Sequence, residues 1–177
     1  MNDLKRLLFK RNKPVLRDYV PLTDKGPGDA PYLWDAYLKD KLNGAEPGMT
    51  MPEFAEYLYE VSQAVSEIYI LEDYVGGELH PIAVVFCNND GWQLEPHVVY
   101  FDNATPRTIL RTYVAFLKKT KWRKDIGAVL IRSEKDGTNL ANRVEKMGLI
   151  EWVGKVWGGR PGGNEYLYSM RCNAGRK

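Results

Sequence analysis

The sequence predicts one α+β domain in which strands and helices follow the order β-α-α-β-β-β-α-β-α-β-β. Two observations support this prediction. Residues 95–148 read strand, turn, helix, strand and helix without a gap, and Asn88-Asn89-Asp90-Gly91 is a strong hairpin signal because Asn and Gly accept positive φ. A length of 177 residues suits a single domain over 1–177, with a basic extension over 1–16.

The first half of the chain predicts a strand over 17–22 and two helices. The first helix, over 32–42, ends at Asn43-Gly44, which tolerate the left-handed conformation. The second begins at Thr50-Met51-Pro52-Glu53, a sequence that fits a capping box, and carries an apolar stripe from Phe54 to Val65.

Three strands are predicted next, over 68–72, 81–87 and 95–101, with a turn at Gly76-Gly77. The central helix that follows has its apolar residues at helical spacing: Ile109, Leu110, Tyr113, Val114 and Leu117. A strand over 127–132, a short helix ending at Gly148, an alternating strand over 150–157 and a closing strand over 166–171 complete the order.

Composition excludes several classes of function. The chain has 25 Lys and Arg against 23 Asp and Glu, a net charge of +2 that does not predict specific nucleic-acid binding. Cys87 and Cys172 form no CxxC pair, so we expect reduced thiols and no metal site. No transmembrane or signal segment is recognised, and we expect a cytoplasmic protein. The basic cluster 118–124 complements the end of the central helix, and an acidic partner is the alternative interpretation.

A family resemblance rests on residues 95–149. The segment Thr138 to Leu149 resembles the N-x-x-A-x-x-L-Y-x-x-x-G-F signature of the GNAT superfamily of N-acetyltransferases, with Val144 at the tyrosine position and Leu149 for the aromatic residue. The predicted element order is also the GNAT order. The resemblance implies a GNAT fold, in which a mixed, mostly antiparallel central sheet has its fourth and fifth strands splayed apart.

The resemblance also implies a cofactor, acetyl-CoA, lying between the splayed strands with its pyrophosphate on a loop before the central helix. The implied cofactor contacts are Val98, Val99, Tyr100, Phe101, Asn103, Ala104, Thr105, Arg107, Thr108 and Asn139. The loop has no glycine and Pro106 has no amide hydrogen, so an ordinary N-cap at Thr105 is the alternative interpretation. Arg107 or Arg111 could then pair with phosphate directly.

Acetyl transfer requires a base that takes a proton from the acceptor amine. The resemblance points to Glu95, and His97 is the other candidate, two residues along the same strand face. The substrate would be an amine on a small molecule or a protein.

A second hypothesis keeps the scaffold without the reaction. Degenerate GNAT-like proteins that this chain resembles occur in tailed phages, including virion-associated proteins. Asp102, Pro106 and Val144 motivate this alternative, in which the chain is a structural protein with protein partners and is located in the virion.

Overall fold

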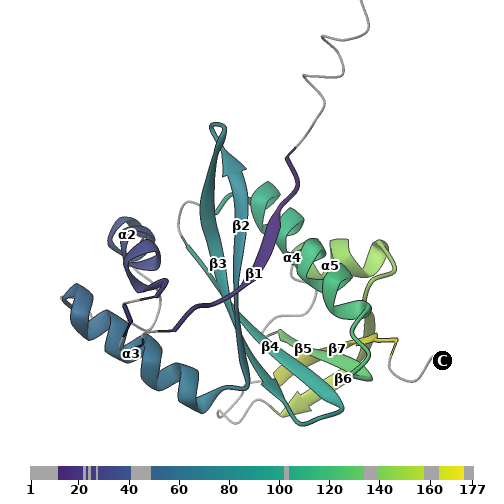
Figure 1. Ribbon diagram of the computed structural model, residues 1–177. Helices are drawn as coiled ribbons and strands as arrows, with labels where there is room; N and C mark the ends of the chain where they lie inside the picture. The colour runs from purple at the N-terminus through teal and green to yellow at the C-terminus, as the bar shows by residue number, and fades with distance from the viewer. Residues whose placement is uncertain are drawn as a thin grey trace, which may run out of the picture.

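The computed structural model describes residues 12–21, 23, 25–26, 28–40, 49–101, 104–133, 139–157 and 164–173. The elements are β1 (Val15–Asp18), α2 (Ala30–Asp40), α3 (Met51–Ala64), β2 (Glu67–Val75), β3 (Glu78–Asn89), β4 (Gln93–Tyr100), α4 (Pro106–Lys121), β5 (Ala128–Ser133), α5 (Asn139–Lys146), β6 (Glu151–Trp157) and β7 (Asn164–Arg171). The predicted element order is confirmed (Figure 1).

The seven strands form one sheet in the order β1-β2-β3-β4-β5-β7-β6. All neighbours pair antiparallel except β4 and β5, which are parallel. The β2–β3 and β3–β4 turns contain Gly76, Gly77 and Gly91, which all have positive φ, as their place in the predicted turns requires. The predicted mixed, mostly antiparallel sheet is confirmed.

Two helical layers cover the sheet from opposite sides (Figure 1). Helices α2 and α3 pack on β2, β3 and the end of β4 through a core that includes Leu33, Phe54 and Ile70. Helices α4 and α5 pack on the other face, where the core includes Phe116 and Val144. None of the described residues of β5, β6 or β7 belongs to the core under α2 and α3, so that face of β5 and β7 is not covered by these helices.

The first strand lies at Val15–Asp18, so it begins two residues earlier and ends four residues earlier than predicted. It ends there because the next residues bind a loop: the Val20 amide donates to the Asp29 carboxylate at 2.7 Å, and the Val20 carbonyl accepts from the Asp29 amide at 2.9 Å. Arg17 also pairs with Asp29, at 2.8 Å. Asp29, which precedes α2 as predicted, therefore anchors this helix to β1.

Gly28 makes this close approach possible, and we expect its replacement by alanine to destabilise the fold. Gly28 has φ +59°, and a Cβ there would lie 2.2 Å from the Val20 carbonyl oxygen, which is backbone and cannot swing away. The strained conformation and the clash should lower the free energy of unfolding by about 2 kcal/mol. Urea denaturation measures the change, with Gly154→Ala as a control because Gly154 has no positive φ and a Cβ there meets nothing within 4 Å. Equal losses for both variants would contradict the prediction.

Candidate active site at the β4–β5 splay

Strands β4 and β5 separate almost as soon as they have paired. Their parallel register contains two residue pairs, Gln93 with Ala128 and Leu94 with Val129. Pro96 lies just beyond the last pair. Because proline has no amide hydrogen, it cannot donate the next hydrogen bond of the ladder. The predicted splay is confirmed, and its position has a cause in the sequence.

The separation leaves backbone groups of β4 without a strand partner. The Phe101 amide donates to the Ile82 carbonyl of β3 at 3.0 Å. Amide directions alternate along a strand, so the amides of Val98 and Tyr100 point the other way, toward β5. No described residue of β5 pairs with them. These two residues, and not Val99 or Phe101, present their backbone to the splay.

Replacing Pro96 by valine should extend the pairing between the two strands. Valine supplies the missing amide and favours a strand, so we expect β4 and β5 to zip further and the free energy of unfolding to rise by up to about 1 kcal/mol. Ligands that bind between the strands should bind more weakly. Amide hydrogen exchange at Val98 checks the zipping, and unchanged exchange there would contradict it.

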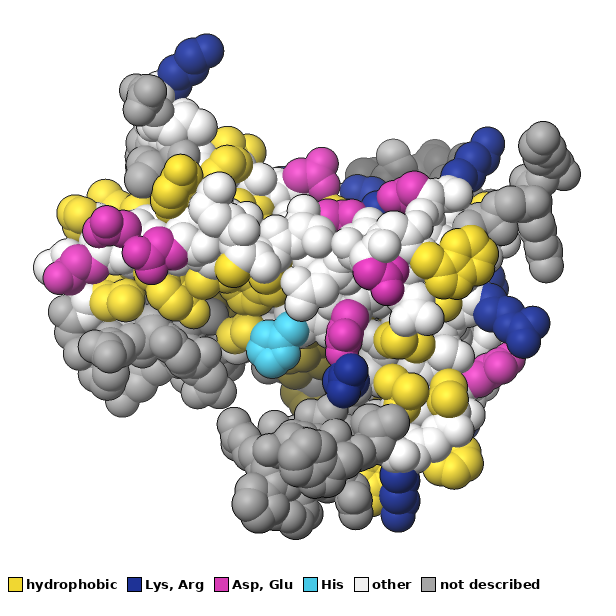
Figure 2. All heavy atoms as spheres, turned by 90° about the horizontal axis from the view of Figure 1, so that it is seen from below, with side chains coloured by type: hydrophobic (Ala, Val, Ile, Leu, Met, Phe, Trp, Pro, Cys, Tyr) yellow, Lys and Arg dark blue, Asp and Glu magenta, His cyan; other side chains and the backbone are white. Residues whose placement is uncertain are grey.

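One face of β4 carries both predicted catalytic residues. Alternation along the strand places Glu95 and His97 on the face that turns toward α2 and α3, where Phe101 packs in the core. His97 is exposed. Glu95 accepts a hydrogen bond from Arg132 Nε of β5, so this ion pair joins the two strands beyond the end of their backbone pairing. Viewed from below, a histidine and charged side chains of both signs lie beside a hollow with hydrophobic side chains (Figure 2).

The opposite face of β4 carries an unpartnered hydroxyl. Val98 and Tyr100 pack against the core under α4 and α5. The Tyr100 hydroxyl is buried and has no hydrogen-bond partner among the described residues. Burial, with a smaller contribution from Tyr113, raises the pKa of Tyr100 above its ordinary value. The side chain therefore stays a neutral donor beside the splay.

The start of α4 binds its own side chains. The Thr105 amide donates to Thr108 Oγ1 at 2.9 Å, and the Thr108 amide donates to Thr105 Oγ1 at 3.2 Å. The Thr108 hydroxyl donates in turn to the Thr105 carbonyl at 3.0 Å. The Ala104 amide donates to the Phe101 carbonyl at 2.9 Å. Thr105 is thus the N-cap and Pro106 begins the helix, which confirms the alternative interpretation of this segment.

These observations test the fit of acetyl-CoA. Its pantetheine arm contains two amides and fits the strand edge at Val98 and Tyr100, where backbone groups lack partners. Its diphosphate does not fit the described part of the α4 start. The amides of Ala104, Thr105 and Thr108 already donate to protein oxygens, and Pro106 has no amide hydrogen. Of the amides in residues 104–108, only that of Arg107 donates no such bond to a described residue. Two predicted cofactor contacts, Asn103 and the side chain of Asn139, lie outside the part of the chain that the structure describes.

Helix α5 keeps the packing of the predicted signature. Val144 is fully buried and Ala141 is nearly so, both in the core under α4 and α5. Gly148 follows the helix with φ +69°, and its amide donates to the Glu145 carbonyl. Val144 therefore serves packing, and its side chain has no proton to donate.

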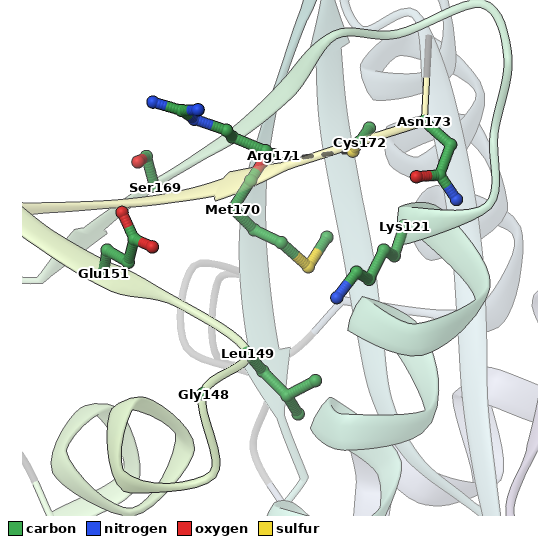
Figure 3. Close-up of a pocket in the computed structure, with 9 residues that line it drawn as sticks. All are labelled: Lys121, Gly148, Leu149, Glu151, Ser169, Met170, Arg171, Cys172 and Asn173. Atoms are coloured by element: carbon green, nitrogen blue, oxygen red, sulfur yellow. Dashed lines mark hydrogen bonds between the residues drawn. The ribbon is translucent and has the colours of Figure 1, made fainter. Parts of the chain in front are cut away.

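A pocket of about 240 Å³ lies at the far end of α4 from this site (Figure 3). Lys121, Leu149 and Met170 point toward one another there, and Cys172 lies beside them. Burial raises the pKa of the Cys172 thiol, which keeps it protonated and unreactive. The described residues contain no cluster that could hold a metal ion. None of their helices has the length and apolarity to cross a membrane.

Solved structures share this architecture. RimL, an α-N-acetyltransferase of a ribosomal protein, was solved in complex with coenzyme A and matches with a TM-score of 0.63 and 13% identity, covering 92% of this chain and 96% of RimL. Together with the seven-stranded sheet, the parallel β4–β5 pair and its splay, this match decides the architecture. The chain has the GNAT fold.

Other GNAT-fold structures match to a similar extent. A spermidine N-acetyltransferase from Vibrio cholerae has a TM-score of 0.60 and 13% identity, covering 90% of this chain and 94% of that protein. A GNAT-family acetyltransferase from Streptococcus pneumoniae has a TM-score of 0.57 and 12% identity, covering 91% of this chain and 100% of that one. No protein-family model and no curated protein sequence matches the chain. At these identities the GNAT fold is established and the activity is not.

Sequence reasoning missed one residue of the site, Arg132, and one property of a predicted residue, the hydroxyl of Tyr100. Arg132 belongs to the predicted strand over 127–132, and side-chain alternation would place it on one face of the sheet. Its contact with Glu95, however, depends on how β4 and β5 separate. The unpartnered hydroxyl of Tyr100 depends on its neighbours in the core and has no signal in the sequence.

Proposed function

We propose that the chain is an N-acyltransferase that moves an acetyl group from a pantetheine thioester, of which acetyl-CoA is the best-known example, to an amine. The observation that supports this proposal most strongly is the short β4–β5 pairing, in which no described residue of β5 pairs with the amides of Val98 and Tyr100. The acceptor is an amine of a small molecule or a protein, as it is in the GNAT-fold structures named for spermidine and ribosomal-protein acetylation.

The open face supplies the proton chemistry. A bound thioester supplies an activated acyl carbon. His97 is exposed on the β4 face that carries Glu95, and its imidazole nitrogen can accept the proton that the amine nitrogen loses as its bond to the acyl carbon forms. Glu95 is held by Arg132, and its negative charge attracts the ammonium form of the acceptor, which gives one proton to solvent to become the attacking amine. The C–S bond breaks, and the thiolate that leaves takes up a proton from solvent.

Thiol release tests the proposal. Acetyl-CoA and a panel of amines (polyamines, amino-sugars, and peptides with free N-termini) are incubated with the full chain, and the freed thiol is trapped with a chromogenic disulfide. We expect amine-dependent release with at least one acceptor, and a thermal shift with the donor alone. Absence of both, at millimolar donor, would refute the activity.

A second candidate function follows from the closed start of α4 and the packed Val144. Both features suit a GNAT-like scaffold that acts through protein partners, such as the virion-associated proteins of tailed phages. In that case the chain would copurify with a stable partner from its native lysate and would not bind a thioester. A monomeric, partner-free chain that releases thiol would exclude this candidate.

A further inference from the structure

We propose that this chain recognises its acyl donor through the pantetheine arm and a single phosphate, so that acetyl-phosphopantetheine serves as well as acetyl-CoA. This inference rests on the proposed function and concerns the donor alone. The described residues at the start of α4 do not fit a diphosphate.

Among the described residues 104–108 at the start of α4, hydrogen-bond donors are too few for a diphosphate. A helix start can offer its first free amides to an anion. Here the Thr108 amide is held by Thr105 Oγ1, the Thr105 amide by Thr108 Oγ1, and Pro106 has no amide. Of the described residues 104–108, Arg107 alone has an amide without such a partner. One amide suits one phosphate oxygen.

The cationic side chains beside the helix start also suit a single phosphate. Arg107 is exposed and makes no ion pair with a described residue. Arg111, one turn further along α4, already pairs with the fully buried Asp73 at 3.3 Å and donates to the Asn12 carbonyl at 2.7 Å. Releasing Arg111 would leave a buried carboxylate unpaired, at a cost that a solvated phosphate contact does not offset. Among the described residues beside the helix start, Arg107 therefore remains as the cation free to bind an anionic group.

The arm itself finds more complementary groups than the phosphates do. The amides and carbonyls of Val98 and Tyr100 lie along the splay at strand spacing, and an extended chain with two amides can pair with them as an added strand does. The buried Tyr100 hydroxyl is a further donor without a partner on the helix side of β4. Affinity should thus reside in the arm, and the nucleotide part of acetyl-CoA should contribute little.

A donor series tests this inference. We would compare kcat/KM for acetyl-CoA, acetyl-phosphopantetheine, acetyl-pantetheine and an acetylated acyl carrier protein with the full chain. We expect the first two to agree within about threefold and acetyl-pantetheine to be about tenfold lower, the value of one charge-assisted contact. Turnover of the carrier protein above free acetyl-phosphopantetheine would identify it as the source of the donor. Turnover below would identify the free thioesters.

A preference for acetyl-CoA over acetyl-phosphopantetheine of about thirtyfold or more would overturn the inference and leave the proposed function intact. No turnover or binding of any donor would instead refute the proposed function itself. Arg107→Gln sharpens the test, because it should reduce acetyl-phosphopantetheine to the level of acetyl-pantetheine and leave acetyl-pantetheine unchanged. Lys118→Gln is the control, since Lys118 is exposed at the other end of the same helix. An Arg107→Gln variant that keeps the phosphate preference would contradict the assignment.

Discussion

Replacement of His97 by glutamine is expected to lower kcat for amine acetylation by a factor of about 10² to 10⁴, the usual contribution of a general base. The side chain is exposed on β4 beside the splay, and glutamine keeps its size and polarity while losing the ability to accept a proton. KM for the donor should change little, because the proposed donor position is along the backbone of Val98 and Tyr100. Steady-state kinetics with a saturating amine measures the effect.

Two further variants make the result specific. His80→Gln removes the other described histidine, which lies near the β2–β3 turn and pairs with Glu78, and should leave kcat unchanged. Glu95→Gln should raise KM for the amine more than it lowers kcat, because Glu95 is already engaged with Arg132. If Glu95→Gln abolished turnover while His97→Gln did not, the base would be Glu95.

Replacement of Arg123 by methionine is expected to lower the free energy of unfolding by about 3 kcal/mol at neutral pH. The guanidinium binds both oxygens of Glu67, which also accepts from Tyr69 and Asn89. Glu67 is 21% exposed and Arg123 is 22% exposed, so water replaces the lost partner poorly. Urea unfolding measures the loss, and Arg143→Met, exposed on α5, should change stability by less than about 0.5 kcal/mol. Similar values for the two variants would contradict a structural role for this cluster.

The same cluster predicts how stability depends on pH. Hydrogen bonds from Arg123 hold the pKa of Glu67 at about 2, against an ordinary value of 4.5. The unfolded chain therefore takes up a proton near pH 4.5, while the folded chain keeps the carboxylate until the pH approaches 2. The stabilisation is complete above pH 4.5 and is lost as the pH falls from there toward 2, by roughly 3 kcal/mol in total. The Arg123→Met variant should lose most of this acid dependence, and an unchanged slope would contradict it.

Much of the fold could be predicted because its signals are local. The capping box at Thr50 and Glu53, the glycines of the two hairpins and the N-cap at Thr105 each depend on residues within four positions of one another. The bounds of strands depend on distant residues as well. β1 ends four residues earlier than predicted because a distant residue, Asp29, binds Val20, and such a contact is not visible in a strand pattern.

The candidate site could be predicted only in part, since its chemistry depends on residues far apart in the chain. Glu95 and Arg132 are separated by 37 positions and meet because the sheet brings β4 beside β5. The residues that occupy the amides at the start of α4, Thr105, Pro106 and Thr108, can be recognised in the sequence as a possible N-cap. Choosing between a cap and a phosphate loop required the hydrogen bonds, since a threonine can cap its helix or leave the amides to an anion.

Pro96 has a consequence beyond the site, because it limits how the two portions of the sheet communicate. With two registered pairs between β4 and β5, the hydrogen-bonded ladder transmits little strain from β1–β4 to β5, β7 and β6. Coupling between these portions passes instead through the side chains packed beneath α4, among them Tyr113 and Leu117. One portion of the sheet can then open locally while the other stays folded. A ligand bound between β4 and β5 would join the two portions into a single cooperative unit.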